Sequence, residues 1–362
     1  MAEPTARETP ATEGLRPKDI AENLRDVLDG NGTADTVSLL ARELEGRPVT
    51  AERLVSVANV LRGRILPVQA PPNRVLIDVA DAGVEPHGLV DVTTGAALLV
   101  AACDGTVVHH GLGPPRMGGV AVLSALGIPV DLDPSRSLAA LEWCGFAHVA
   151  APRHHPWLAR LGALRAAAPR FFALLAPLLN PASPERQLVG VENADDTGPL
   201  LDALVECGAR GALVVSCGGA PFLTADADAV GHAWVDGKRT AFRHAGSTVP
   251  RATLASAGDT RDATRIAAVL SGAQEPLTEA LALTAGAAMW VAGMLPTLTD
   301  GRLWAADRLA QGIDLADLGA LRPGERPPPI ARTRTAPASV STSPRSPRPP
   351  RAGGRRGPGR PG

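Results

Sequence analysis

The N-terminal part of the chain has a helical pattern of apolar residues. Between residues 18 and 63 they recur every three or four positions, a spacing that places them on one face of an α-helix. Pro48 and Thr50 interrupt the pattern and mark the start of a new helix. The apolar positions are Ile20, Leu24, Val27, Leu28, Val37, Leu40, Ala41, Leu44, Leu54, Val57, Ala58 and Leu61. We predict a small all-helical unit, which needs a partner surface because three short helices make only a thin core.

From Val75 onward the pattern changes to an alternation of short apolar strands and helices. β-branched runs bounded by Gly, Pro or polar residues are typical of buried parallel strands. The predicted strands are residues 75–80, 106–111, 148–152, 187–191, 211–216 and 232–236, and the predicted helices are residues 91–105, 119–127, 264–270 and 279–295. This alternation predicts an α/β fold with a mainly parallel central sheet and surrounding helices.

The two ends of the chain have a composition that disfavours folding. Residues 322–362 contain ten arginines and one acid, Glu325, so the tail carries about +9; since the net charge is −1, about −10 remains elsewhere. The tail is otherwise rich in Pro, Ser, Gly and Thr, which bury too little apolar surface to offset the entropy of ordering. We predict disorder for residues 1–17 and 322–362, a helical domain at 18–70 and an α/β domain at 71–321.

Composition argues against several classes of protein. Apolar residues make up 45% and charged residues 20% of the chain, as in ordinary globular proteins, so a large core is possible. No apolar run is long enough to cross a bilayer and the first residues do not resemble a secretion signal, so we expect a cytoplasmic protein without membrane contact. The four cysteines form no CxxC pair, which favours reduced thiols. The basic tail lacks aromatic residues, so it is either a solvated extension or a weak, sequence-independent contact for nucleic acid or another polyanion.

Histidines and a cysteine allow two further hypotheses. The pairs His109–His110 and His154–His155 suggest zinc, but adjacent strand residues point to opposite faces, so each pair supplies at most one ligand to a given site. Cys217 follows a predicted strand and would be a nucleophile only beside a base; a small buried thiol is the simpler interpretation. The glycine-containing loops match neither the Walker nor the Rossmann fingerprint.

Residues 77–111 carry a more specific signal. Without a gap, this segment resembles the phosphoribose-binding segment of the anthranilate phosphoribosyltransferase family, which consists of a strand, a GTGGD loop, an N-I-S-T helix start and a K-H-G turn. Further segments follow the family's order at similar spacing, namely residues 145–158, 173–182, 187–191, 211–216, 257–263 and 286–293. The resemblance covers roughly residues 20–321.

The resemblance implies a fold and an activity. The family has a small helical domain, here residues 18–70 joined by a later helical segment around 155–185, beside an α/β domain. The site is in the cleft between them, and the helical domains form a homodimer. Members transfer 5-phosphoribose from phosphoribosyl pyrophosphate (PRPP) to the amine of anthranilate in tryptophan biosynthesis, and release pyrophosphate with the help of Mg²⁺. The strand–loop–helix segment offers backbone N–H groups and a helix N-terminus to phosphate.

Residue by residue, the resemblance assigns two sides of one site. The sugar-phosphate side comprises Asp81, Gly83, Asp91, Thr93, Thr94 and His109. The acceptor side comprises His110, His155 and Arg165, of which Arg165 matches an arginine that binds the acceptor's carboxylate. The candidate metal ligands are Glu85, Asp259 and Asp262. From the residues alone, a surface ion pair for Arg165 and a turn-fixing role for His155 stay open.

The chain departs from the family's motifs where phosphate binds. Asp81 and Val84 replace glycines, Asp91 replaces an asparagine, and His109 replaces a lysine. The loop after residue 111 lacks the metal-binding serine, and the apolar residues 220–223 replace an acidic pair. A carboxylate about 4 Å from a phosphate oxygen repels it by about 4 kcal/mol at an effective dielectric of 20. PRPP in the usual pose therefore needs a bridging metal.

Two explanations of these changes stay open. Asp81, Glu85 and Asp91 could form a relocated magnesium site, since Mg²⁺ prefers oxygen ligands, or PRPP binding could be lost. The first functional hypothesis is a glycosyltransferase that moves (phospho)ribose from PRPP or a related donor to anthranilate or another aromatic amine or acid. The alternative is a catalytically inactive family member that binds a polyanion or a protein partner.

Overall fold

The computed structural model of the chain describes residues 14–84, 88–112, 118–246 and 250–318, all within one compact unit, Met1–Arg332. The predicted tail 322–362 and residues 1–13 lie outside the described residues. Residues 14–17 correct the expectation of N-terminal disorder, because the Leu15 N–H donates to Glu43 Oε2 at 3.0 Å and the first helix begins at Pro17. The predicted domain boundary near residue 70 stays a prediction.

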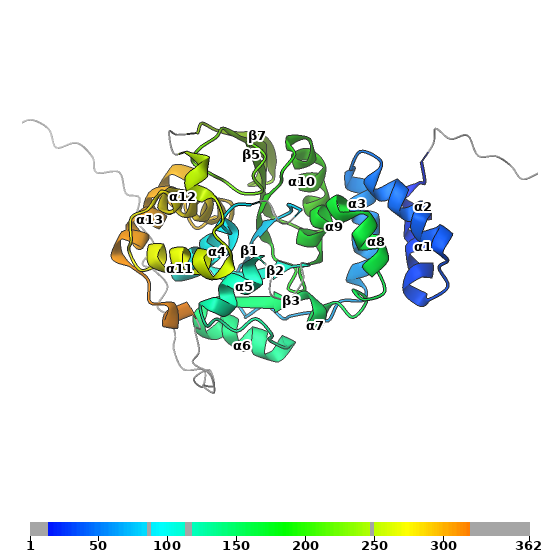
Figure 1. Cartoon of the computed structure of the whole chain (residues 1–362), viewed down its shortest axis with the longest axis horizontal. Coiled ribbons are helices and arrows are strands. Elements are labelled where there is room, and N and C mark those ends of the chain that lie inside the picture. The colour runs from blue at the N-terminus through cyan, green and yellow to red at the C-terminus, as the bar shows by residue number, and fades with distance from the viewer. Residues whose placement is uncertain (1–13, 85–87, 113–117, 247–249, 319–362) are drawn as a thin grey trace, which may run out of the picture. The chain divides into compact units, whose positions relative to one another are not determined.

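The three predicted N-terminal helices are present as α1 (Pro17–Asp29), α2 (Ala34–Glu45) and α3 (Ala51–Arg62) (Figure 1). Their ends follow from capping. The side chains of Thr33 and Thr50 accept hydrogen bonds from the backbone N–H groups of Thr36 and Arg53, in the first turns of α2 and α3, which would otherwise lack partners. The largest of the apolar side chains predicted to lie on one face of these helices are buried, which confirms the helical period.

The central sheet has seven strands in the order β3-β2-β1-β4-β5-β6-β7. The strands are β1 (Leu76–Asp81), β2 (Thr106–Gly111), β3 (Phe146–Ala150), β4 (Arg186–Gly190), β5 (Gly211–Cys217), β6 (Ala229–Val235) and β7 (Lys238–His244). The first five in spatial order run parallel, whereas β6 and β7 pair antiparallel. The mainly parallel α/β sheet is therefore confirmed.

Of the edge hairpin β6–β7, the sequence predicted only the first strand, at residues 232–236. Asp236 and Gly237 connect the two strands, and both have a positive φ, of 52° and 72°. This two-residue turn matches the twist of a hairpin, and Asp-Gly is the dipeptide that it favours. The sequence signal was present, but the polar residues of β7 hid the strand, because an exposed edge strand needs no apolar alternation.

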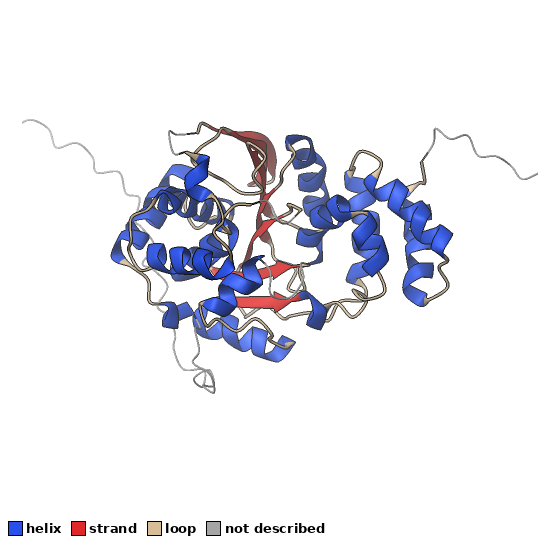
Figure 2. Cartoon of the chain, in the orientation of Figure 1, coloured by secondary structure: helices blue, strands red, loops and turns tan. Residues whose placement is uncertain are grey.

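Helices cover both faces of the sheet (Figure 2). The remaining α-helices are α4 (Val92–Ala102), α5 (Gly118–Ala125), α6 (Pro134–Cys144), α7 (Ala151–His154), α8 (Gly162–Ala167), α9 (Pro169–Leu175), α10 (Thr197–Glu206), α11 (Asp259–Leu270), α12 (Pro276–Val291) and α13 (Leu298–Gln311). None of the helices in the described ranges is long and apolar enough to cross a membrane. The sequence did not predict α6, α10 and α13.

Alternate residues of one strand enter different cores. In β5, Leu213 and Val215 belong to a core with α4, α11 and α12, whereas Ala212 and Val214 belong to a core on the other face. That second core also contains residues of α1, α3, α9 and α10. The N-terminal helices and the segment around 155–185 therefore share one core with strand and α10 residues, and their assignment to one helical domain stays a prediction.

The carboxyl ends of four parallel strands lie side by side. Asp81 of β1 is in register with Gly190 of β4, and Gly111 of β2 is in register with Ala150 of β3. In parallel α/β sheets, the loops that follow these ends form the ligand crevice. The fold therefore brings the residues after β1, β2, β3 and β4 to one edge of the sheet.

Candidate active site

A cavity of about 300 Å³ opens at this edge of the sheet. Its lining comes from the ends of β1 and β2, from β3, from the starts of α4 and α5, and from α8, α9 and the residue after α9. The lining residues are Ala80, Asp81, Gly83, Val84, Asp91, His109, His110, Gly111, Leu112, Gly119, Val120, His148, Arg165, Pro169, Phe172, Ala173 and Ala176. Six of the predicted site residues are among them: Asp81, Gly83, Asp91, His109, His110 and Arg165. The volume is at the lower end of what small-molecule sites have.

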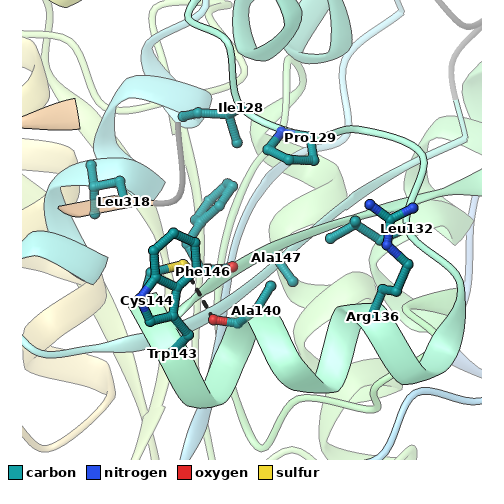
Figure 3. A pocket seen from close by; sticks show the side chains of 10 residues that line it. All are labelled: Ile128, Pro129, Leu132, Arg136, Ala140, Trp143, Cys144, Phe146, Ala147 and Leu318. Carbon is teal, nitrogen blue, oxygen red and sulfur yellow. Dashed lines mark hydrogen bonds between the residues drawn. The ribbon is translucent and has the colours of Figure 1, made fainter. Parts of the chain in front are cut away.

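A second cavity lies beside α6 and the start of β3 (Figure 3). It measures about 30 Å³, so it holds no more than about one water molecule. Its walls are mainly apolar, and the Cys144 thiol beside it donates to the Ala140 carbonyl at 3.2 Å. The larger, polar cavity is therefore the candidate site.

Two carboxylates meet at Thr93 on the sugar-phosphate side. The Thr93 hydroxyl lies 3.0 Å from Asp81 Oδ2 and 2.8 Å from Asp91 Oδ1. A hydroxyl has a single proton, so it donates to only one of these oxygens at a time. Asp81 and Asp91 both line the cavity, so this side of the cavity is anionic.

Asp91 also caps α4. Its Oδ1 accepts from the Thr94 backbone N–H at 2.9 Å, and its Oδ2 accepts from the Thr94 hydroxyl at 2.6 Å. Aspartate is a favoured N-cap because it satisfies a free N–H and complements the helix dipole. A side chain of the protein thus binds a helix N-terminal donor that would otherwise suit a phosphate.

The loop after β1 also donates a backbone hydrogen bond to a carboxylate of the protein itself. The Val84 N–H donates to Glu192 Oε1 at 3.1 Å, and Glu192 lies two residues after the end of β4. Gly83 is required here because a Cβ would lie 2.8 Å from Pro221 and 3.1 Å from Glu192 Oε1. Sequence reasoning missed Glu192; its position beyond a neighbouring parallel strand was the signal that could have found it. Glu85 lies outside the described residues.

His109 belongs to a chain of hydrogen bonds on one face of β2. Its Nε2 lies 3.2 Å from Thr94 Oγ1 and its Nδ1 lies 3.0 Å from Nδ1 of His148. Burial lowers the pKa of both imidazoles, so both are neutral near pH 7. His148 is in direct register with His109 across β2 and β3, and sequence reasoning missed it as a site residue.

His110 lies on the opposite face of β2, as the strand period predicted. Its Nε2 is 2.8 Å from Nε2 of His155, whose ring stands edge-on to Trp157 at 5.1 Å. Burial, followed by the charges of His154 and Arg165, lowers the pKa of His155 to about 3. His109 and His110 therefore pair with different histidines, His148 and His155. The described residues contain no group of three or more His, Cys, Asp or Glu arranged to hold a metal.

Arg165 lies on α8 at the cavity wall. Its Nη2 donates to the Leu112 carbonyl at 2.5 Å, and its Nε has no partner in the part of the chain that the structure describes. Burial lowers the pKa of this guanidinium. Within the described ranges Arg165 forms no ion pair, so the alternative of a surface ion pair does not describe it.

Asp259 and Asp262 lie at the start of α11 and do not line the cavity. Asp262 is buried and accepts hydrogen bonds from the Ser256 hydroxyl and the Ala257 N–H, at 2.5 and 2.9 Å, so it holds the loop before α11. Their proposed metal role stays a prediction without support from this geometry. Cys217 is buried, with its sulfur 3.0 Å from Thr224 Oγ1 and no base among the partners described, in keeping with a structural thiol.

Comparisons with known proteins now bear on this geometry. Residues 73–314 match the model of the glycosyl transferase family, a/b domain. Anthranilate phosphoribosyltransferase of Methylobacterium radiotolerans is 34% identical over 82% of this chain and 86% of the relative, and that of Azospirillum brasilense is 32% identical over 76% and 79%.

Similar solved structures are anthranilate phosphoribosyltransferases as well. Anthranilate phosphoribosyltransferase from Thermus thermophilus has a TM-score of 0.76 at 29% identity, over 84% of this chain and 94% of that chain. The Saccharomyces cerevisiae enzyme in complex with PRPP and Mg has a TM-score of 0.72 at 17% identity, over 85% and 92%, which shows a shared fold. The family match and the sequence relatives extend over the strands, the cavity and its walls. The chain therefore belongs to the glycosyl transferase family that includes the anthranilate phosphoribosyltransferases.

Proposed function

We propose that this chain is a phosphoribosyltransferase that transfers the phosphoribosyl group of PRPP to anthranilate or to another aromatic amine that carries a carboxylate. One observation carries the proposal: a single cavity has an acidic, metal-suited wall at Asp81 and Asp91 and a cationic wall at Arg165. PRPP with its metal suits the first wall, and an acceptor carboxylate suits the second. The similarity to anthranilate phosphoribosyltransferases supports the same reaction.

The proposed Mg²⁺ site consists of Asp81 and Asp91. Their carboxylate oxygens converge on Thr93, and Asp81 Oδ2 and Asp91 Oδ1 share one hydroxyl proton, so the donor set suits a hard cation. Mg²⁺ commonly takes one or two carboxylates and completes its shell with water and substrate phosphates. Bound there, it would neutralise charge on the leaving pyrophosphate. Without it, repulsion between these carboxylates and PRPP would oppose binding.

The chain's own residues position the acceptor. Arg165 has an Nε without a partner among the described residues, and its planar guanidinium can hold a carboxylate in two hydrogen bonds. His110 and His155, both neutral, lie against each other on the same side of β2. Transfer then forms a bond from the acceptor nitrogen to the anomeric carbon while the bond from that carbon to pyrophosphate breaks. Holding the two substrates in contact supplies much of the rate gain in such a step.

The position in metabolism and the assembly belong to the same proposal. Tryptophan biosynthesis is the pathway that an anthranilate acceptor indicates, and a specialised aromatic pathway fits the altered phosphate loop. A homodimer through the helical domain and a cytoplasmic location are expectations that follow from the family resemblance. The inactive binding-protein hypothesis makes opposite predictions about PRPP, so one experiment separates them.

Calorimetric titration of PRPP, with and without Mg²⁺, tests this proposal. We expect binding of PRPP in Mg²⁺ and little binding after chelation. Asp81→Asn removes a metal-binding charge and should weaken PRPP binding in Mg²⁺ about tenfold or more, a loss of at least about 1.4 kcal/mol. Asp35→Asn, at an exposed position in α2, is the matched control and should change nothing.

The outcomes separate the alternatives. Tighter PRPP binding by the Asp81→Asn variant in Mg²⁺ would mean that Asp81 only repels the substrate, and the metal assignment would be wrong. No heat from wild-type protein up to millimolar PRPP would exclude ordinary transfer and favour the inactive binding protein. Anthranilate-dependent release of pyrophosphate, measured in parallel, decides whether anthranilate is the acceptor.

A further inference from the structure

His148 is a fully buried histidine in the wall of the candidate site. It lies on β3, is 1% exposed and lines the cavity together with His109, Gly119 and Val120. Its Nδ1 contacts Nδ1 of His109 at 3.0 Å, whereas its Nε2 is buried without a hydrogen-bond partner among the residues that the structure describes. A buried polar atom that stays without a hydrogen bond costs about 1–3 kcal/mol of stability, so we consider which group could donate a hydrogen bond to this nitrogen.

The hydrogen bonds determine which nitrogen of His148 carries the proton. The Thr94 hydroxyl is 2.6 Å from the carboxylate of Asp91, which only accepts, so Thr94 donates to Asp91. Thr94 Oγ1 must then accept from Nε2–H of His109. A neutral imidazole has one N–H, so Nδ1 of His109 is bare and accepts from Nδ1–H of His148. Nε2 of His148 is therefore a bare lone pair.

A lone pair selects its ligand by chemistry. Phosphate oxygens of PRPP also carry lone pairs and cannot donate to it, whereas sugar hydroxyls and an aromatic amine can. We propose that His148 is a substrate-positioning residue whose Nε2 accepts a hydrogen bond from a hydroxyl or amine of the bound substrate. This inference rests on the proposed transferase function for the identity of the substrate. The hydrogen-bond chain Asp91–Thr94–His109 keeps Nε2 of His148 free of a proton.

The proton position is tested without any substrate. In ¹⁵N-histidine-labelled protein at pH 7, the signals lost in the His148→Phe variant identify His148. We expect a protonated Nδ1 and an unprotonated Nε2 in the wild type. Thr94→Val removes the hydroxyl that orients His109 and should give His148 a mixture of both tautomers. A protonated Nε2 in the wild type would overturn the inference, whether or not the protein transfers phosphoribose.

Binding tests the second half of the inference. His148→Phe keeps a ring but removes the acceptor, so the dissociation constant for one substrate should rise about 5- to 30-fold, as expected for one lost hydrogen bond. His148→Gln places an amide oxygen near the former Nε2 and should stay within about threefold of wild type. His232→Phe, on β6 and outside the cavity lining, is the matched control for loss of a strand histidine.

PRPP and anthranilate are titrated separately, each against the three variants and the wild type. A loss confined to PRPP identifies a sugar hydroxyl as the donor, and a loss confined to anthranilate identifies its amine. Unchanged affinity of His148→Phe for both substrates would overturn the inference even if transfer is normal. Conversely, a His148 effect on binding in a protein that forms no product would support the inference while the proposed transferase function fails.

Discussion

At the scale of single residues, the ligands that the candidate site can bind depend on which of its hydrogen-bonding groups already have partners. Asp91 and Glu192 accept hydrogen bonds from Thr94 N–H and Val84 N–H, which are donors that a phosphate would use. By contrast, Nε of Arg165, at the cavity wall, has no partner within the described ranges. The phosphate side is therefore anionic and largely satisfied, whereas the acceptor side offers free donors. This contrast makes Arg165 the residue whose substitution is most informative.

Arg165→Lys should raise KM for anthranilate with a smaller effect on kcat. Lysine keeps the positive charge but lacks the planar fork that holds a carboxylate by two hydrogen bonds. Loss of a hydrogen bond to a charged group costs about 1.5–3 kcal/mol, so KM should rise about 10- to 150-fold. Steady-state kinetics with varied anthranilate at saturating PRPP measures the effect.

Arg160→Lys is the control for this change. Arg160 is exposed, lies outside the cavity lining and donates to the Leu28 carbonyl. It should leave KM for anthranilate within about twofold. Equal effects of the two substitutions would show that Arg165 acts through stability rather than through contact with the acceptor.

At the scale of elements, close helix packing depends on small residues in α12 and α13. A Cβ at Gly286 would lie 2.3 Å from the backbone nitrogen of Arg302, and a Cβ at Gly301 would lie 2.3 Å from the Gly286 carbonyl oxygen. Backbone atoms cannot yield as a flexible side chain does. The two helices therefore contact each other backbone to backbone.

Gly286→Ala should destabilise the protein by about 1–2 kcal/mol. Overpacking at a tight contact costs about 1–3 kcal/mol, and the better helix propensity of alanine returns up to about 1 kcal/mol. Urea unfolding followed by circular dichroism measures the difference. Gly162→Ala is the control, because no atom lies within 4 Å of a Cβ there, and it should be neutral or slightly stabilising. A stabilised Gly286→Ala variant would contradict the contact.

At the scale of the whole molecule, one buried carboxyl at the centre of the sheet couples stability to pH. Asp78 of β1 is 0% exposed. Its Oδ2 accepts from the Asn180 side chain at 2.9 Å, while its Oδ1 has no hydrogen-bond partner among the described residues. Asn180 also donates to the Val108 carbonyl of β2. Burial raises the pKa of Asp78 from 3.8 to about 7, and the hydrogen bond from Asn180 only partly opposes this.

The raised pKa predicts that stability falls as pH rises from about 4 to about 7. In this window the unfolded chain has an ionised Asp78 while the folded chain keeps it protonated, so each pH unit costs about 1.4 kcal/mol, up to about 4 kcal/mol in total. Above pH 7 both states are ionised and the penalty is constant. Asp78→Asn should remove this slope.

The measurement is the free energy of unfolding of both proteins between pH 4 and 8. The difference between them isolates Asp78 from other titrating groups. Asp317→Asn, at an exposed position in the 3₁₀-helix Leu315–Leu318, controls for the loss of any one carboxylate and should keep the slope. Parallel pH profiles for wild type and Asp78→Asn would contradict a strongly raised pKa.

Much of the molecule followed from local patterns in the sequence. The helical period between residues 18 and 63, the apolar strands and the motif order determined the helices, the parallel sheet and the family, because these features depend on residues close together in the chain. The motifs also located Asp81, Asp91, His109, His110 and Arg165 at one cavity, since loops after parallel strands meet at one edge.

Only the tertiary structure decided which distant side chains pair. The register of β2 and β3 placed His148 against His109, and the approach of the β4 end placed Glu192 on the Val84 N–H. The same packing buried Asp262 away from the cavity. Period and motif are properties of neighbouring residues, whereas these contacts join positions 5 to 108 apart, so strand register and loop geometry determine them.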